Sequence, residues 1–172
     1  MKTTAIAVLV LLLCVAAAWG DESADQRARA LRANVKTFRL ELAYHGDQDK
    51  PFYQLTLSAE PIKPSDAFSR RVQIDEPQTL AIIDHLAKSG ALDRAHKTGK
   101  LEKLPRACYL LRVQAGDLDV TEILGWDLAM LRQLDGLRAV LQGEAATSMD
   151  LLIGRLSGLR QAWEKEARTS AT

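Results

Sequence analysis

The stretch CYLLRVQAGDLDVTEIL, residues 108–124, carries the clearest fold signal in the chain. Apolar and polar side chains alternate on both sides of Gly116-Asp117, and this dipeptide suits a two-residue turn. The spacing predicts two antiparallel strands, with Leu118 placed opposite Ala115. A β-hairpin is therefore the unit from which the rest of the fold can be worked out.

Three further strands are predicted before this hairpin. Residues 35–45 and 52–59 alternate in the same way, and the turn-forming stretch 46–51 between them predicts a second hairpin. A shorter strand follows at Arg70–Ile74, after two prolines that end the preceding strand. The side chains expected to point inward are Phe38, Leu40, Leu42, Tyr44, Tyr53, Leu55, Leu57, Ala59, Val72 and Ile74.

Three helices are predicted from apolar spacing and from capping residues. The first begins after Asp75, where Gln78 completes a capping box, and ends at Gly90. The second begins after Asp127, and the short Gln142-Gly143 link to the third predicts an antiparallel pair. Their apolar stripes are Leu80, Ile83, Leu86 and Ala87, then Met130, Leu134, Leu137 and Leu141, then Ala145, Met149, Leu152, Leu156, Leu159 and Trp163.

The resulting order, β-β-β-α-β-β-α-α, is typical of an α+β domain. We expect an antiparallel sheet built from two hairpins and one short strand, with the helices on one face. This domain spans residues 35–167. The charged segment 21–34 before it forms a frayed helix or stays loose, and residues 168–172 form a disordered tail.

Residues 1–20 have the three-part pattern of a cleaved secretory signal peptide. The apolar run is shorter than a membrane-spanning helix, which needs about 20 residues. Cleavage after Gly20 or Ala18 predicts a secreted or periplasmic protein without a stable membrane span. A lipoprotein anchored at Cys14 is disfavoured, because the leucine before it is larger than the residue that such signals require.

The balance of charges argues against one class of partner. The chain has 23 basic and 22 acidic residues, and loss of Lys2 with the leader leaves 22 of each. Such a balance disfavours nucleic acid as a partner, since phosphate binding needs a basic surface.

Only Cys108 remains after cleavage, so no internal disulfide can form and the hydrophobic core alone must hold the domain. We expect the Cys108 thiol to be buried and unreactive.

The sequence contains no zinc-ligand spacing, no phosphate-binding glycine loop and no nucleophile turn. We therefore expect no metal and no cofactor. The catalytic candidates are His85 and Asp84, although adjacent helix positions point about 100° apart. Other combinations would pair His85 or His45 with Asp75 or Glu76, and His96 lies in a basic connector.

Two surfaces are candidates for binding. The connector 93–106 places a cluster of basic side chains in a predicted loop that either binds an acidic ligand or is simply solvated: Arg94, Lys97, Lys100, Lys103 and Arg106. The last helix has a stripe that either packs on its own sheet or contacts a partner or a second copy of the chain: Leu151, Gly154, Gly158 and Ala162.

Two functional hypotheses follow. The first is an exported, non-enzymatic domain that binds a protein or a cell-envelope partner. The second is a small exported hydrolase that uses a histidine and a carboxylate. They differ in whether His85 lies in a pocket together with an acidic side chain or on the flank of its helix.

Overall fold

The structure is a computed structural model that describes residues 22–45, 54–62, 69–98, 108–125 and 128–169. The predicted leader and the Asp127 cap lie outside these ranges, as do Phe52 and Tyr53 of the second predicted strand. No helix within these ranges has both the length and the apolar character needed to cross a bilayer.

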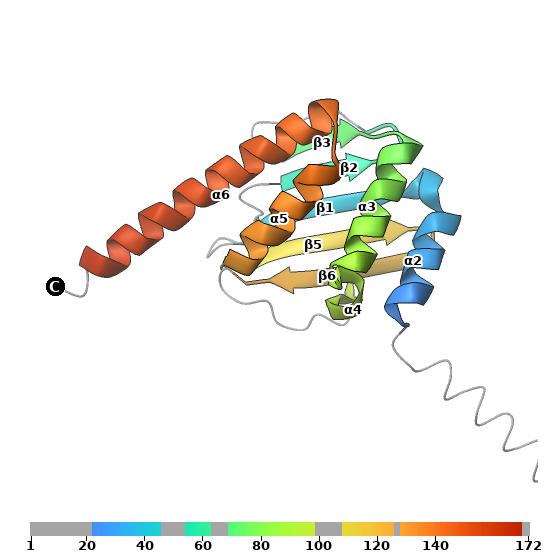
Figure 1. Cartoon of the computed structure of the whole chain (residues 1–172), viewed down its shortest axis with the longest axis horizontal. Helices are drawn as coiled ribbons and strands as arrows, with labels where there is room; N and C mark the ends of the chain where they lie inside the picture. Colours follow the sequence, from blue (N-terminus) through green and yellow to red (C-terminus); the bar gives the residue numbers. More distant parts are fainter. Residues whose placement is uncertain (1–21, 46–53, 63–68, 99–107, 126–127, 170–172) are drawn as a thin grey trace, which may run out of the picture.

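A six-stranded sheet, with the strand order β3-β2-β1-β5-β6-β4, forms one layer (Figure 1). All neighbouring strands are antiparallel except β2 and β3, which are parallel, so the sheet is mixed rather than wholly antiparallel as predicted. Alternation shows which residues form a strand, but it carries no information about the direction of a strand that follows a long connection. The strands are β1 Arg39–His45, β2 Gln54–Ser58, β3 Ser69–Gln73, β4 His96–Lys97, β5 Cys108–Ala115 and β6 Leu118–Leu124.

The β5–β6 hairpin forms in the predicted register. Ala115 pairs with Leu118 across the turn, and Gly116 in that turn has a φ of 56°. A Cβ atom on Gly116 would also lie 2.8 Å from the side chain of Asn34, so both the backbone conformation and the available space require glycine. The β1–β2 pairing is antiparallel as predicted, and it places Leu40 beside Leu57.

The helices form the second layer, on one face of the sheet (Figure 1). α5 and α6 run side by side in opposite directions, joined at Leu141 and Gln142, and α6 projects beyond the sheet at its C-terminal end. Helix α2, the short helix α4 and strand β4 are additions to the predicted order. The bounds are α2 Ala24–Ala33, the 3₁₀ turn η1 Val35–Thr37, α3 Glu76–Lys88, α4 Ala91–Arg94, α5 Leu128–Val140 and α6 Gly143–Thr169.

One hydrophobic core lies between the two layers, and most of the predicted inward residues are in it. Fully or almost fully buried are Phe38, Leu40, Leu42, Leu55, Leu57, Val72, Ile74, Met130, Leu134, Leu137, Leu141, Ala145, Met149, Leu152 and Leu156. Cys108 is buried as predicted, and burial raises the pKa of its thiol. The side chains of Leu159 and Trp163 lie outside the described part of α6.

The predicted stripe of α3 is partly wrong. Thr79 and Ile82 are completely buried, whereas Leu80 is only half-buried. Because α3 packs against both α2 and α5, its buried face is wider than one stripe and is rotated from the predicted one. Asp75 caps the helix by accepting from the backbone N–H of Gln78, but the Gln78 side chain accepts from Gln142 N–H instead of completing a capping box.

Helix α2 is an integral part of the core, whereas its charge pattern had suggested a frayed or loose segment. A capping box between Ser23 and Gln26 begins the helix, and Leu31 is completely buried. Arg27 is only 2% exposed, because its Nη1 donates to the carbonyl oxygens of Leu92 and Ala95 in and after α4. The guanidinium thus satisfies the C-terminal carbonyls of α4 and ties α2 to it.

We expect the Arg27→Met substitution to lower the free energy of unfolding by about 2–3 kcal/mol, because it leaves two buried carbonyls without donors. Arg29 on the same helix is exposed and provides the matched control. Arg29→Met should change stability by less than about 0.5 kcal/mol. Urea unfolding followed by circular dichroism measures both values, and equal effects would contradict the structural role of Arg27.

Candidate functional site

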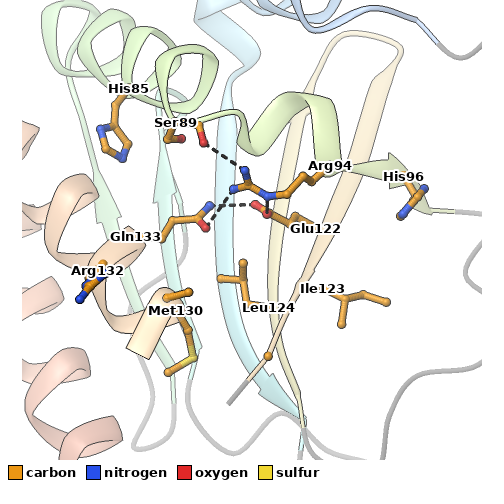
Figure 2. A pocket seen from close by; sticks show the side chains of 12 residues that line it. His85, Ser89, Arg94, His96, Glu122, Ile123, Leu124, Met130, Arg132 and Gln133 are labelled. Carbon is orange, nitrogen blue, oxygen red and sulfur yellow. Dashed lines mark hydrogen bonds and ion pairs between the residues drawn. The ribbon is translucent and has the colours of Figure 1, made fainter. Parts of the chain in front are cut away.

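A pocket of about 640 Å³ lies where the C-terminal ends of α3 and β6 meet α4 and the beginning of α5. Figure 2 shows its polar side chains converging from these elements: His85 from α3, Arg94 from α4, Glu122 from β6 and Gln133 from α5. Leu124 and Met130 contribute apolar surface on the opposite side. We call this the α3–β6 pocket.

Glu122 is the residue around which the pocket is built. The register places it beside Leu111 on the helix-covered face of the sheet, in the same row as Val120 and Leu124. Its side chain is only 4% exposed. A buried carboxylate is costly unless it is paired and hydrogen-bonded, so its partners must come from the helices. Glu122 is absent from the candidate residues predicted from the sequence, although it is the one acidic residue that interrupts this apolar row.

Two neighbouring side chains donate to the Glu122 carboxylate and are also hydrogen-bonded to each other. Arg94 Nε donates to Oε1 at 2.5 Å, and Gln133 Nε2 donates to Oε2 at 2.8 Å. The Arg94 guanidinium also donates through Nη2 to Gln133 Oε1 at 3.3 Å and through Nη1 to the Ser89 carbonyl at 3.1 Å. This network fixes Arg94, which is half-exposed, in one orientation and joins three elements at the back of the pocket.

The break between α3 and α4 brings Arg94 into this position. Gly90 follows the end of α3 with a φ of 72°, a left-handed conformation that glycine adopts without strain. A Cβ atom there would lie 3.1 Å from Arg94 Nη1. Gly90 ends α3 as predicted from the sequence, and it also makes room for the guanidinium.

His85 lies in the pocket wall, where its ring is pressed against α5. A Cβ atom on Gly136 would be 2.5 Å from His85 Cε1 and 3.0 Å from Nε2. The Nε2 atom is buried and has no hydrogen-bond partner, and burial lowers the pKa of the imidazole. This contact explains why a glycine stands in the middle of α5, because any larger residue at position 136 would collide with the ring.

The predicted catalytic partners of His85 do not converge on it. Asp84 points to α2 and pairs with Arg32 at 2.6 Å, and this hydrogen bond lowers the pKa of its carboxyl. Asp75 and Glu76 lie at the other end of α3, roughly 15 Å along the helix. The side chain of His45 is outside the described residues. The acidic residue that does share the pocket with His85 is Glu122.

The predicted basic connector is divided by the fold. Arg94 is held in the Glu122 network, and Lys97 is exposed in β4. Lys100, Lys103 and Arg106 lie outside the described residues. A different cation, Arg132 on α5, is exposed at the pocket and has no ion-pair partner in the part of the chain that the structure describes.

The predicted stripe on α6 faces away from the core. Leu151 is 48% exposed, and Cβ atoms built on Gly154 and Gly158 would meet nothing within 4 Å. The side chain of Ala162 lies outside the described residues. Gly154 and Gly158 therefore do not pack on the sheet, whereas Leu151 lines a small pocket together with Leu55 and Arg70 of β2 and β3.

We expect Gly136→Ala to destabilise the fold by about 1–3 kcal/mol, although alanine is the better helix former, because the new methyl group collides with His85. In a His85→Ala background the same substitution should be neutral or stabilising by up to about 1 kcal/mol. A thermal or urea double-mutant cycle measures this coupling, and additive effects would show that the two residues do not touch.

Burial of His85 also predicts a pH dependence of stability. Because the folded state lowers the pKa of the imidazole from 6.5, the unfolded chain takes up a proton first as the pH falls. The free energy of unfolding should therefore decrease as the pH drops below about 7, and this part of the decrease should be absent in His85→Gln. Urea titrations of both proteins between neutral and mildly acidic pH test this, and parallel curves would refute it.

Comparison with known proteins identifies no relative that carries this arrangement. No family model, no curated protein and no solved structure matches the chain. The function must therefore be inferred from the α3–β6 pocket and from the surfaces around it.

Proposed function

We propose that the chain is an exported, non-enzymatic domain that binds a protein or cell-envelope partner through the α3–β6 pocket. The observation that carries this proposal is the closed network of Arg94, Glu122, Gln133 and the Ser89 carbonyl. It leaves both carboxylate oxygens of Glu122 engaged, so the network shapes a cavity rather than presenting a free base. Export rests on the leader pattern of residues 1–20.

The dimensions and composition of the pocket support binding. Ligand pockets commonly measure about 300–1,000 Å³ and combine apolar walls with a few fixed polar groups. Here Leu124 and Met130 supply apolar surface, and Arg132 supplies an exposed guanidinium at the same opening. Because the polar groups are already ordered by one another, a ligand would immobilise few additional side chains, which favours affinity.

A hydrolase is the second candidate, favoured by the presence of His85 and Glu122 in one pocket. The state of the candidate catalytic atoms argues against this function. A general base needs a free lone pair within hydrogen-bond reach of the substrate. The Nε2 atom of His85 is buried against Gly136, and the Glu122 oxygens already accept from Arg94 and Gln133. Catalysis by Nε2 would require α5 to move, and catalysis by Glu122 would require the network to open.

Site-specific photo-crosslinking tests the binding proposal. A photoreactive amino acid replaces Arg132 at the pocket and, in the control, Lys36, which is exposed on η1. We expect one discrete adduct from position 132 and none from position 36 in cells that export the chain. Adding Ala129→Trp, which fills the pocket from the exposed side of α5, should abolish the adduct without altering the circular dichroism spectrum.

Two results would contradict the proposal. Equal labelling from positions 132 and 36 would indicate random encounters rather than a site. Hydrolysis of a nitrophenyl ester by the purified chain, lost on His85→Ala but retained in Asp84→Asn, would favour the hydrolase instead.

A further inference from the structure

The α3–β6 pocket runs along a part of the β6 edge that no described strand covers. Four consecutive residues, 122–125, line it, so the pocket follows the backbone of β6 rather than isolated side chains. β4 covers β6 only at Val120 and Thr121. Towards Leu124 the chain before β4 turns into α4, and no described strand pairs with this part of the edge.

The hairpin register shows which backbone groups face that edge. In a two-residue hairpin the residues that flank the turn, here Ala115 and Leu118, form a hydrogen-bonded pair, and the pattern then alternates. Val120, Glu122 and Leu124 therefore direct their N–H and C=O groups towards β5. Thr121 and Ile123 direct theirs outward, and of these two residues only Thr121 is paired with β4. No described strand pairs with the outward N–H and C=O of Ile123, and Ile123 is one of the residues that line the pocket.

We propose that the partner is an extended peptide segment with an acidic side chain, which adds to β6 as a further strand at Ile123. This inference rests on the proposed binding function and specifies its ligand. Strand addition uses backbone hydrogen bonds for affinity and pockets for alternate side chains for selectivity. The side chains of the added strand would alternate between the α3–β6 pocket on the helix side and the surface beside Ile123 and His96 on the other.

The charge of the pocket supports an acidic segment. Glu122 is neutralised by Arg94, so Arg132 contributes an uncompensated positive charge within the described residues. Arg94 also retains N–H groups beyond the three that donate within the network. Arg94 and Arg132 both line the pocket, from α4 and α5, so a carboxylate on a pocket-facing side chain of the peptide would meet a guanidinium group on either side, with Leu124 and Met130 supplying apolar surface.

The two edges of the sheet differ in composition. The outer strand β3 carries Arg70 and Arg71, and charged side chains on an edge strand oppose pairing with another chain. At the opposite edge, Ile123 and Leu124 are apolar and Gly125 has no side chain. The segment of β6 that no described strand covers therefore lacks the charged side chains that β3 has.

The test uses a displayed library of random short peptides, selected on the full chain and screened for binders that Ala129→Trp excludes. We expect these peptides to carry an aspartate or glutamate among alternating apolar residues. Ile123→Pro removes the outward N–H without removing a β5–β6 hydrogen bond and should weaken binding about tenfold or more. The matched control Ile123→Val keeps the N–H and should stay within about fourfold of the wild type. Arg132→Gln should weaken binding about twofold to fivefold.

Amide hydrogen exchange gives a reading that does not depend on whether the proline variant folds. The Ile123 amide of the wild-type chain should exchange rapidly when free and become protected when a selected peptide is added. Protection in the free chain, or no change on binding, would overturn strand addition.

Peptides that bind Ile123→Pro as well as Ile123→Val would likewise overturn strand addition. They would leave the binding function intact as long as Ala129→Trp still excludes them. Strand addition would also be overturned if the selection yielded no peptide whose binding is lost in Ala129→Trp. The photo-crosslinked adducts at position 132 would then show by themselves whether the pocket binds a partner.

Discussion

The side-chain carboxylate of Glu122, buried on the helix-covered face of the sheet, is the constraint on which the pocket depends. A charge in that position needs a cation and donors within reach, because the surrounding row consists of Val120, Leu111 and Leu124. The chain supplies them by ending α3 at Lys88, turning at Gly90 and bringing Arg94 back over the sheet. Gln133 completes the shell from α5, so one carboxylate positions parts of three elements.

Buried or close-packed polar side chains fix other parts of the helical layer as well. Arg27 joins α2 to α4 through carbonyl oxygens, and the His85 ring meets α5 at Gly136. Such contacts contribute less to stability than the core does, but they are directional, and they specify how the helices lie against each other. The rigidity they give the pocket is the property that favours a binding role over a catalytic one.

The proposed binding and the proposed strand addition are linked by the short length of β4. Because α4 occupies the chain just before His96, β4 begins too late to pair with the end of β6. The same segment that carries Arg94 to Glu122 therefore leaves Ile123 without a partner among the described strands. The charge pair inside the fold and the short β4 are two consequences of one local turn.

Much of the fold could be predicted because local periodicity reflects burial. The β5–β6 hairpin, the core face of β1, the Asp75 cap and the apolar stripe of α5 all follow from spacing within a few residues. The parallel direction of β3 could not be predicted, since strand direction after a long connection depends on which edge the chain reaches. The burial of Arg27 escaped prediction because its acceptors lie more than sixty residues away in the sequence.

The sequence by itself determined the α+β class, most of the strands and helices, and a large part of the hydrophobic core, because each depends on neighbours a few positions apart. It also indicated His85 as a catalytic candidate and Arg94 as part of a basic loop, whereas the fold places His85 against Gly136 and Arg94 against Glu122. Only the tertiary structure decided that Glu122, Gln133 and Arg132 share a pocket with them. Those side chains come from separate elements, and their meeting depends on the register of the sheet and the packing of α3 and α5, which no local pattern encodes.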